Sequence, residues 1–134
     1  MIAYGTTRRL DLPFDEAVDA VRAALGEQGF GVLTEIDLRA TMKAKLDLDV
    51  PSQVILGACN PPLAHRAMQI EPSIGLLLPC NVVVRETPEG TVVEAIDPGV
   101  LSRWSGNDAL EPVADEVGRK LAAAMVALEQ EVPV

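Results

Sequence analysis

Aromatic side chains, cysteines and basic residues are all scarce in this chain of 134 residues. Phe, Trp and Tyr make up 3% of the sequence, whereas hydrophobic residues make up 49%. A hydrophobic share of that size excludes a disordered chain, and it requires a core of Val, Leu, Ile, Ala and Met. At this length we expect a single domain, residues 1–134, that buries most of its apolar surface without disulfides.

The only two cysteines, Cys59 and Cys80, are too few for the disulfide framework of a secreted protein. The first nine residues lack the basic start and apolar middle of a signal peptide. No apolar run approaches the roughly 20 residues that span a bilayer. We therefore expect a cytoplasmic protein with reduced thiols and no membrane partner.

Basic residues are outnumbered by acidic ones, 11 to 20, which gives a net charge of −9. Binding to a phosphate backbone requires clustered Lys and Arg side chains, and here they are spread along the chain. Nucleic acid is therefore not an expected partner. We interpret the excess of acid as a contribution to solubility.

Hydrophobic periodicity predicts nine elements in the order strand, helix, strand, short helix, strand, helix, strand, strand, helix. Pro88-Glu89-Gly90 is typical of a hairpin turn, and residues 101–106, which hold the lone Trp104, are interpreted as a connector. The predicted strands are residues 2–10, 30–38, 52–59, 74–86 and 91–97, and the predicted helices are residues 13–26, 40–48, 61–71 and 107–128.

This order predicts an α+β fold, a two-layer sandwich in which a mixed, mostly antiparallel sheet of about five strands carries helices on one face. The first strand, helix and strand are typical of a parallel crossover. One helical layer leaves the second face of the sheet bare, yet residues 52–59 and 74–86 are apolar on both faces. We therefore expect a homodimer that covers this face or a strand edge.

Two Cys-Asn pairs are the most unusual chemical feature of the sequence. The first pair ends one predicted strand and the second lies near the start of another, while an aspartate closes a third strand. Strand ends and helix N-termini are natural places for a small ligand, with an anion as one option. A thiol beside a helix N-terminus would also have a lowered pKa. The candidate residues are Cys59, Asn60, Cys80, Asn81 and Asp97, and we expect Glu35 and Asp37 of a fourth strand to join the same group.

Some of these residues also have structural interpretations. Asn60 suits the N-cap of a helix that has Pro61 at its first position. Asp97 precedes Pro98-Gly99, so it is either a turn former or a partly buried acid. His65 lies off the apolar stripe of its helix, and we expect it near solvent.

Glu35 and Asp37 share one face of the second predicted strand, about 7 Å apart. That geometry suits a metal or acid–base site, and solvated strand-face charge is the alternative. The chain has no Gly-rich phosphate loop, Cys-x-x-Cys, His-Glu-x-x-His or nucleophile elbow. The sequence therefore predicts no metal site, identifies no cofactor and assigns no catalytic residue.

Four segments carry a resemblance to a known family. They are Gly-Val-Leu-Thr-Glu-Ile-Asp at residues 31–37, Ala-Cys-Asn-Pro-Pro-Leu-Ala at 58–64, Ile-Gly-Leu-Leu-Leu-Pro-Cys-Asn-Val at 74–82 and Glu-Ala-Ile-Asp-Pro at 94–98. The chain resembles, over nearly its whole length, the bacterial and archaeal family called domain of unknown function 302. The resemblance implies a compact α+β fold, typically dimeric, with no established activity.

Three hypotheses on function remain open. The first is a module that binds a small ligand, with Asn60 and Asn81 as polar contacts. The second is a thiol enzyme, redox sensor or soft-metal protein that uses Cys59 and Cys80. The third is a structural or interaction protein whose cysteines are inert core residues.

Overall fold

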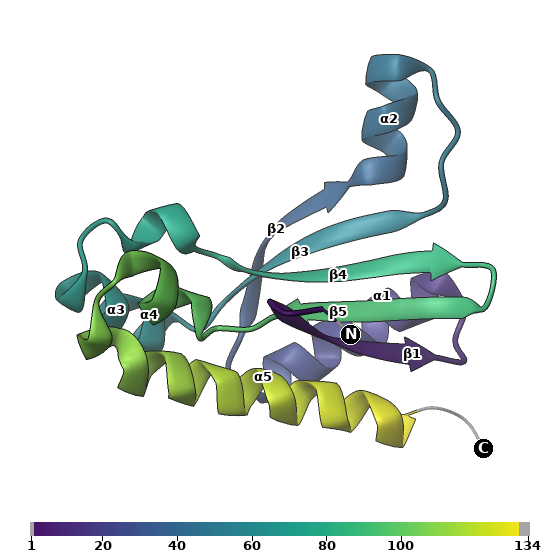
Figure 1. The fold of residues 1–134 in the computed structure, drawn as a ribbon. Coiled ribbons are helices and arrows are strands. Elements are labelled where there is room, and N and C mark those ends of the chain that lie inside the picture. The colour runs from purple at the N-terminus through teal and green to yellow at the C-terminus, as the bar shows by residue number, and fades with distance from the viewer. Residues whose placement is uncertain (1, 132–134) are drawn as a thin grey trace.

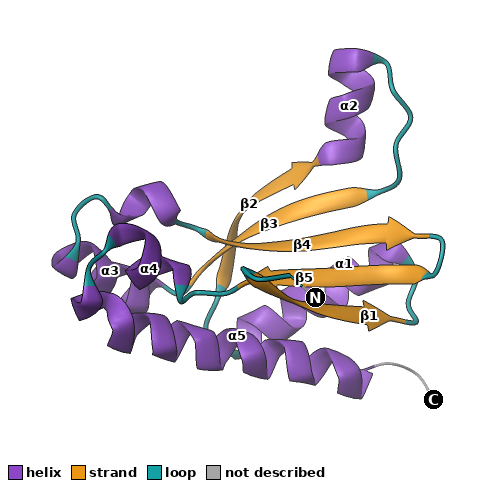
Figure 2. Ribbon diagram, in the orientation of Figure 1, coloured by secondary structure: helices purple, strands orange, loops and turns teal. Residues whose placement is uncertain are grey.

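The computed structural model describes residues 2–131. Figure 1 shows the course of the chain and Figure 2 its helices and strands. The elements are β1 (Gly5–Leu10), α1 (Phe14–Glu27), β2 (Gly31–Asp37), α2 (Leu38–Leu46), β3 (Gln53–Cys59), α3 (Pro61–Ile70), the 3-10 helix η1 (Ile74–Leu77), β4 (Cys80–Thr87), β5 (Gly90–Ile96), α4 (Val100–Ser105), the 3-10 helix η2 (Asp108–Leu110) and α5 (Glu111–Glu131).

The five strands form one sheet in the order β1-β5-β4-β3-β2. The predicted α+β sandwich is therefore confirmed, as is the β4–β5 hairpin. The sheet was expected to be mixed, and this needs a correction, because each of the four neighbouring pairs is antiparallel. β1 and β2 lie at opposite edges of the sheet and run in the same direction, so the predicted parallel crossover through α1 is present although the two strands are not neighbours.

One face of the sheet carries the core. Alternation along β3 and β4 turns every second side chain toward α1 and α5, and those side chains are almost fully buried. The long apolar stripe predicted for the last helix packs against them and is confirmed. The buried set includes Val54, Leu56 and Ala58 of β3, Val82 and Val84 of β4, and Val113, Val117, Leu121, Ala124 and Leu128 of α5.

Within residues 2–131, no helix packs across the opposite face of the sheet (Figure 1), and we call it the open face. It carries Ile36, Ile55 and Val83 in adjacent register positions of β2, β3 and β4. Ile36 is 46% exposed. The bare face expected from the sequence is therefore present, although its apolar side chains are only partly exposed.

Short elements gather at the end of the sheet where β3 ends and β4 begins. Figure 1 shows α3 and α4 packed there. Residues 101–106 were predicted to be a connector, and this was wrong because residues 101–105 belong to α4 and Gly106 is its C-cap. Trp104 of α4 is 63% exposed. The predicted fourth strand also begins later than expected, at Cys80, because residues 74–77 form η1.

Helix α2 stands away from the body of the molecule (Figure 1), and the structure buries none of its residues. Asp37 is its N-cap and accepts a hydrogen bond from the backbone N–H of Ala40 at 2.9 Å. Asp47 ends it in the left-handed conformation, with φ of 55°. The helix predicted at residues 40–48 is therefore confirmed, and it begins two residues earlier.

Candidate functional site

The predicted candidate residues separate into two groups at opposite ends of the sheet. Cys80 is the register partner of Ala58, next to Cys59. Because β5 runs antiparallel to β4, its C-terminal end, followed by Asp97, lies beside the start of β4. The fold thus brings Cys59, Asn60, Cys80, Asn81 and Asp97 to one end of the sheet, as the sequence predicted.

Glu35 and Asp37 do not belong to this group. They pair with Leu56 and Val54 of β3, and Val54 is about 16 Å along the strand from Cys59. Glu35 forms an ion pair with Arg22 of α1, and Asp37 caps α2. The geometry therefore favours the interpretation of Glu35 and Asp37 as solvated side chains with structural roles.

The two cysteines lie on neighbouring strands but point to opposite faces of the sheet. Cys80 faces the helices and is 6% exposed, while alternation turns Cys59 toward the open face. Both residues are free thiols. They border an apolar cavity of about 20 Å³, closed by Phe30, Leu63 and Leu101 among others. A cavity of that size holds about one water molecule.

Burial opposes ionisation of both thiols. It raises the pKa of Cys59, and burial together with the nearby Cys59 thiolate raises the pKa of Cys80 from 9.0 to about 11. The lowered pKa expected for a thiol beside a helix N-terminus was therefore wrong, since desolvation exceeds the effect of the helix. A raised pKa disfavours the thiolate at neutral pH, and the thiolate is the form that nucleophilic and redox chemistry requires.

Asn60 has a structural role in the fold. Its side-chain oxygen accepts a hydrogen bond from the backbone N–H of Leu63 at 3.4 Å, which makes it the predicted N-cap of α3. Its amide nitrogen donates to the carbonyl oxygen of Gln28 at 3.4 Å. Both polar groups of Asn60 therefore have protein partners, whereas Asn81 is exposed on the open face.

Asp97 has the turn-forming role that the sequence allowed. One carboxylate oxygen accepts from the backbone N–H of Gly99 at 2.9 Å, and the other accepts from Arg103 at 3.3 Å. The side chain is also 42% exposed. Asp97 thus fixes the turn into α4 and is not a buried acid.

A larger hollow lies between β1 and α5, and we call it the β1–α5 groove. Its volume is about 660 Å³, and Asp97 is on its wall. No local sequence pattern predicts this groove, because its walls come from opposite ends of the chain. The other lining residues include Ile2, Thr6, Arg8, Ile96, Leu121 and Ala122.

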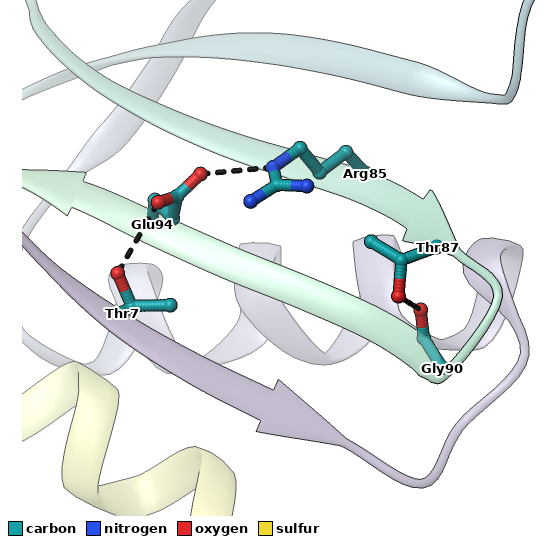
Figure 3. Close-up of polar contacts among 5 residues, drawn as sticks. All are labelled: Thr7, Arg85, Thr87, Gly90 and Glu94. Atoms are coloured by element: carbon teal, nitrogen blue, oxygen red, sulfur yellow. Dashed lines mark hydrogen bonds and ion pairs between the residues drawn. The ribbon is translucent and has the colours of Figure 1, made fainter. Parts of the chain in front are cut away.

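The open face carries a small cluster of polar side chains beside its apolar residues. Glu94 of β5 accepts hydrogen bonds from Arg85 of β4, at 2.9 Å, and from Thr7 of β1, at 3.2 Å (Figure 3). Glu94 is the register partner of Val83. The charges on this face are therefore largely compensated within the chain. At the adjoining hairpin, Thr87 donates to the carbonyl oxygen of Gly90 at 2.7 Å.

Metal binding and membrane insertion find no support in residues 2–131. No group of three or more His, Cys, Asp and Glu side chains in that range is arranged to hold a metal ion. His65, the lone histidine, is exposed as expected. Over the same range, no helix is both long and apolar enough to cross a bilayer.

Comparison with known proteins identifies the family. The model of the family described as domain of unknown function DUF302 matches residues 6–128, so the chain belongs to that family. It is similar to the crystal structure of an uncharacterized conserved DUF302 protein from Bacillus stearothermophilus, with a TM-score of 0.86 and 27% sequence identity. The match covers 93% of this chain and 98% of that one. No curated protein matches the chain.

Proposed function

We propose that this protein is a cytoplasmic, homodimeric domain that binds a small molecule beside Asp97, at the β1 edge of the sheet. The observation that carries the ligand proposal is the β1–α5 groove. Its 660 Å³ falls within the range of about 300–1,000 Å³ typical of ligand pockets. The cavity between Cys59 and Cys80 is about 20 Å³, so a ligand there would have to displace packed side chains.

The lining of the groove suggests the class of ligand. Ile2, Ile96 and Leu121 offer apolar contacts, while Thr6, Arg8 and Asp97 add polar groups to the wall. A small organic molecule with an apolar body and a polar head fits this mixture. The thiol hypothesis is weaker, because burial raises the pKa of both cysteines.

A fragment screen on the wild-type protein tests the ligand proposal. The screen includes matched pairs of fragments, such as phenylacetate and phenylacetamide, which differ in charge but little in shape. Binding of each fragment is measured by ligand-observed NMR and by thermal shift, so a preference for charge is separated from a preference for shape. Ligand that binds only the folded state raises the melting temperature. Ala122→Phe should narrow the groove and abolish binding, whereas Ala23→Phe, at an exposed position of α1, should leave binding intact. Binding that survives Ala122→Phe would contradict the proposal.

Support for the homodimer comes from the distribution of apolar side chains. Four large hydrophobic residues in the β2–α2 region are at least 46% exposed: Leu33, Ile36, Leu46 and Leu48. Large apolar side chains left exposed in one region of the chain support a protein–protein contact there. Light scattering after size-exclusion chromatography measures the mass directly. A single species of 14.3 kDa, the mass of one chain, would contradict the homodimer.

A further inference from the structure

We propose that α2 is an exchanged arm: in the homodimer, α2 of each copy lies in a groove between α1 and β2 of the other. This inference rests on the homodimer proposed above. The groove, which we call the acidic groove, has a volume of about 290 Å³. It is lined by the carboxylates Asp15, Asp19, Glu35 and Asp37 and by apolar residues that include Phe14 and Val18.

Helix α2 lacks the packing that normally stabilises a helix of its length. It has 9 residues, and none of them is buried. Isolated helices shorter than about 12–15 residues are marginal in water, and most helices in proteins depend on tertiary packing. Its polar contacts are all exposed: the Asp37 cap, the ion pairs of Lys43 with Asp47 at 2.9 Å and with Asp49 at 3.6 Å, and the hydrogen bonds that Thr41 donates to the Asp37 carbonyl oxygen and Arg39 donates to Ser52. Such an exposed ion pair contributes only about 0.2–0.5 kcal/mol to the stability of the helix. A partner surface would supply the tertiary packing that α2 lacks within its own chain.

The charges of the arm and the groove are complementary. Residues 38–46 contain Arg39, Lys43 and Lys45 and no acid, and Lys43 is paired with Asp47 and Asp49 just beyond the helix. The acidic groove carries four carboxylates, one of which is paired with Arg22. Opposite potentials on two surfaces favour their association and fix its orientation. No other helix of the chain combines this cationic character with a lack of buried residues within residues 2–131.

The apolar parts of the two surfaces also match. Leu46, at the end of α2, is 61% exposed. In the acidic groove, Phe14 and Val18 of α1 form an apolar floor between the carboxylates. An arm that places Leu46 on this floor and Lys45 beside Asp19 would bury apolar surface and pair charges in the same contact.

The position of both surfaces at one sheet edge makes a second copy the fitting occupant. Helix α2 follows β2 directly, and β2 is one wall of the acidic groove. A two-fold axis beside β2 therefore brings each arm to the groove of the other copy. Such a contact is isologous: it uses the same surfaces twice and closes at two subunits.

A charge swap in the full-length chain tests this placement. The dimer dissociation constant is measured by analytical ultracentrifugation for the wild type, Lys45→Glu, Asp19→Lys and the double variant. Each single variant should raise the constant about tenfold or more, equivalent to about 1.4 kcal/mol. The double variant should return it to near the wild-type value, because each arm again meets a groove of opposite charge.

Lys120→Glu in α5 is the matched control, since it changes the net charge by the same amount away from the arm and the acidic groove. It should leave the dissociation constant unchanged. Lys45 and Asp19 are exposed, so thermal melting should show that the variants are folded. A dimer that is insensitive to both single variants would overturn the arm exchange while the homodimer stands. A monomeric wild type would overturn both.

Discussion

Gly57 of β3 lies directly beneath Pro79, and a methyl group at Gly57 would come within 2.7 Å of the Pro79 Cγ. It would also collide with the hydroxyl oxygen of Thr34 on the neighbouring strand. A glycine inside a strand marks either a bulge or a close approach of another segment, and at Gly57 the structure has the close approach. The irregularity in register lies instead in β2, between Val32 and Thr34.

Gly57→Ala should therefore destabilise the fold by about 2 kcal/mol, the usual cost of overpacking a tight site. Chemical denaturation of the wild type and the variant measures the change in free energy of unfolding. Gly26→Ala is the control, because nothing lies within 4 Å of its added methyl group in α1. That substitution should stabilise the protein by about 0.5–1 kcal/mol. Equal effects of the two variants would contradict the packing argument.

Asn60→Ala should lower the free energy of unfolding by about 1–2 kcal/mol. The variant loses the N-cap of α3 and leaves the carbonyl oxygen of Gln28 without its donor. Asn81→Ala, at an exposed position, should change stability by less than about 0.5 kcal/mol. If Asn60→Ala leaves stability unaltered but abolishes ligand binding, Asn60 is a ligand contact and not a structural cap.

Alkylation of the native protein should be slow at both cysteines and slower at Cys80. A thiol with a pKa of about 11 is ionised in only about one molecule in ten thousand at pH 7. Cys80 is also buried, whereas Cys59 is partly accessible. Iodoacetamide labelling at several pH values, with mass spectrometry to locate the adduct, measures both rates. Rapid labelling of Cys80 before unfolding would show that its environment differs from this structure.

Stability should fall as the pH rises from about 9 to 11. The raised pKa of Cys80 means that the folded state keeps its proton while the unfolded state releases it. The unfolded state therefore binds fewer protons in this window, and the free energy of unfolding decreases by up to about 2–3 kcal/mol. Below pH 9 this contribution is fully present. Cys80→Ala should have a flatter pH profile in denaturant melts, and an unchanged slope would exclude Cys80 as its source.

Local patterns in the sequence predicted most of the elements. The stripe of α5 and the Asn60–Pro61 start of α3 were readable because their signals lie within one or two helical turns. Helix α4 was missed because its 6 residues are too short to show a period. The strand order was not readable either, since β1 pairs with a strand from the far side of the chain.

The sequence predicted the positions of the candidate residues only where those positions follow from the ends of neighbouring strands. An antiparallel β3–β4–β5 meander necessarily brings Cys59, Cys80 and Asp97 to one end of the sheet. The separation of Glu35 and Asp37 from them depends on β2 pairing antiparallel with β3. The burial of the two thiols depends on packing between distant segments, and so does the presence of the β1–α5 groove. No local sequence pattern encodes such packing.

The strand order has a consequence for how the chain reaches its native state. The first two strands form the two edges of the sheet, so β1 has no neighbour until β5 exists. Thr7 and Glu94, joined across that pairing, are 87 residues apart in the sequence. Contacts of such long range slow folding. We expect the β3–β4–β5 meander to form early and β1 to dock last, so the amide protons of β1 should gain protection from hydrogen exchange after those of β4.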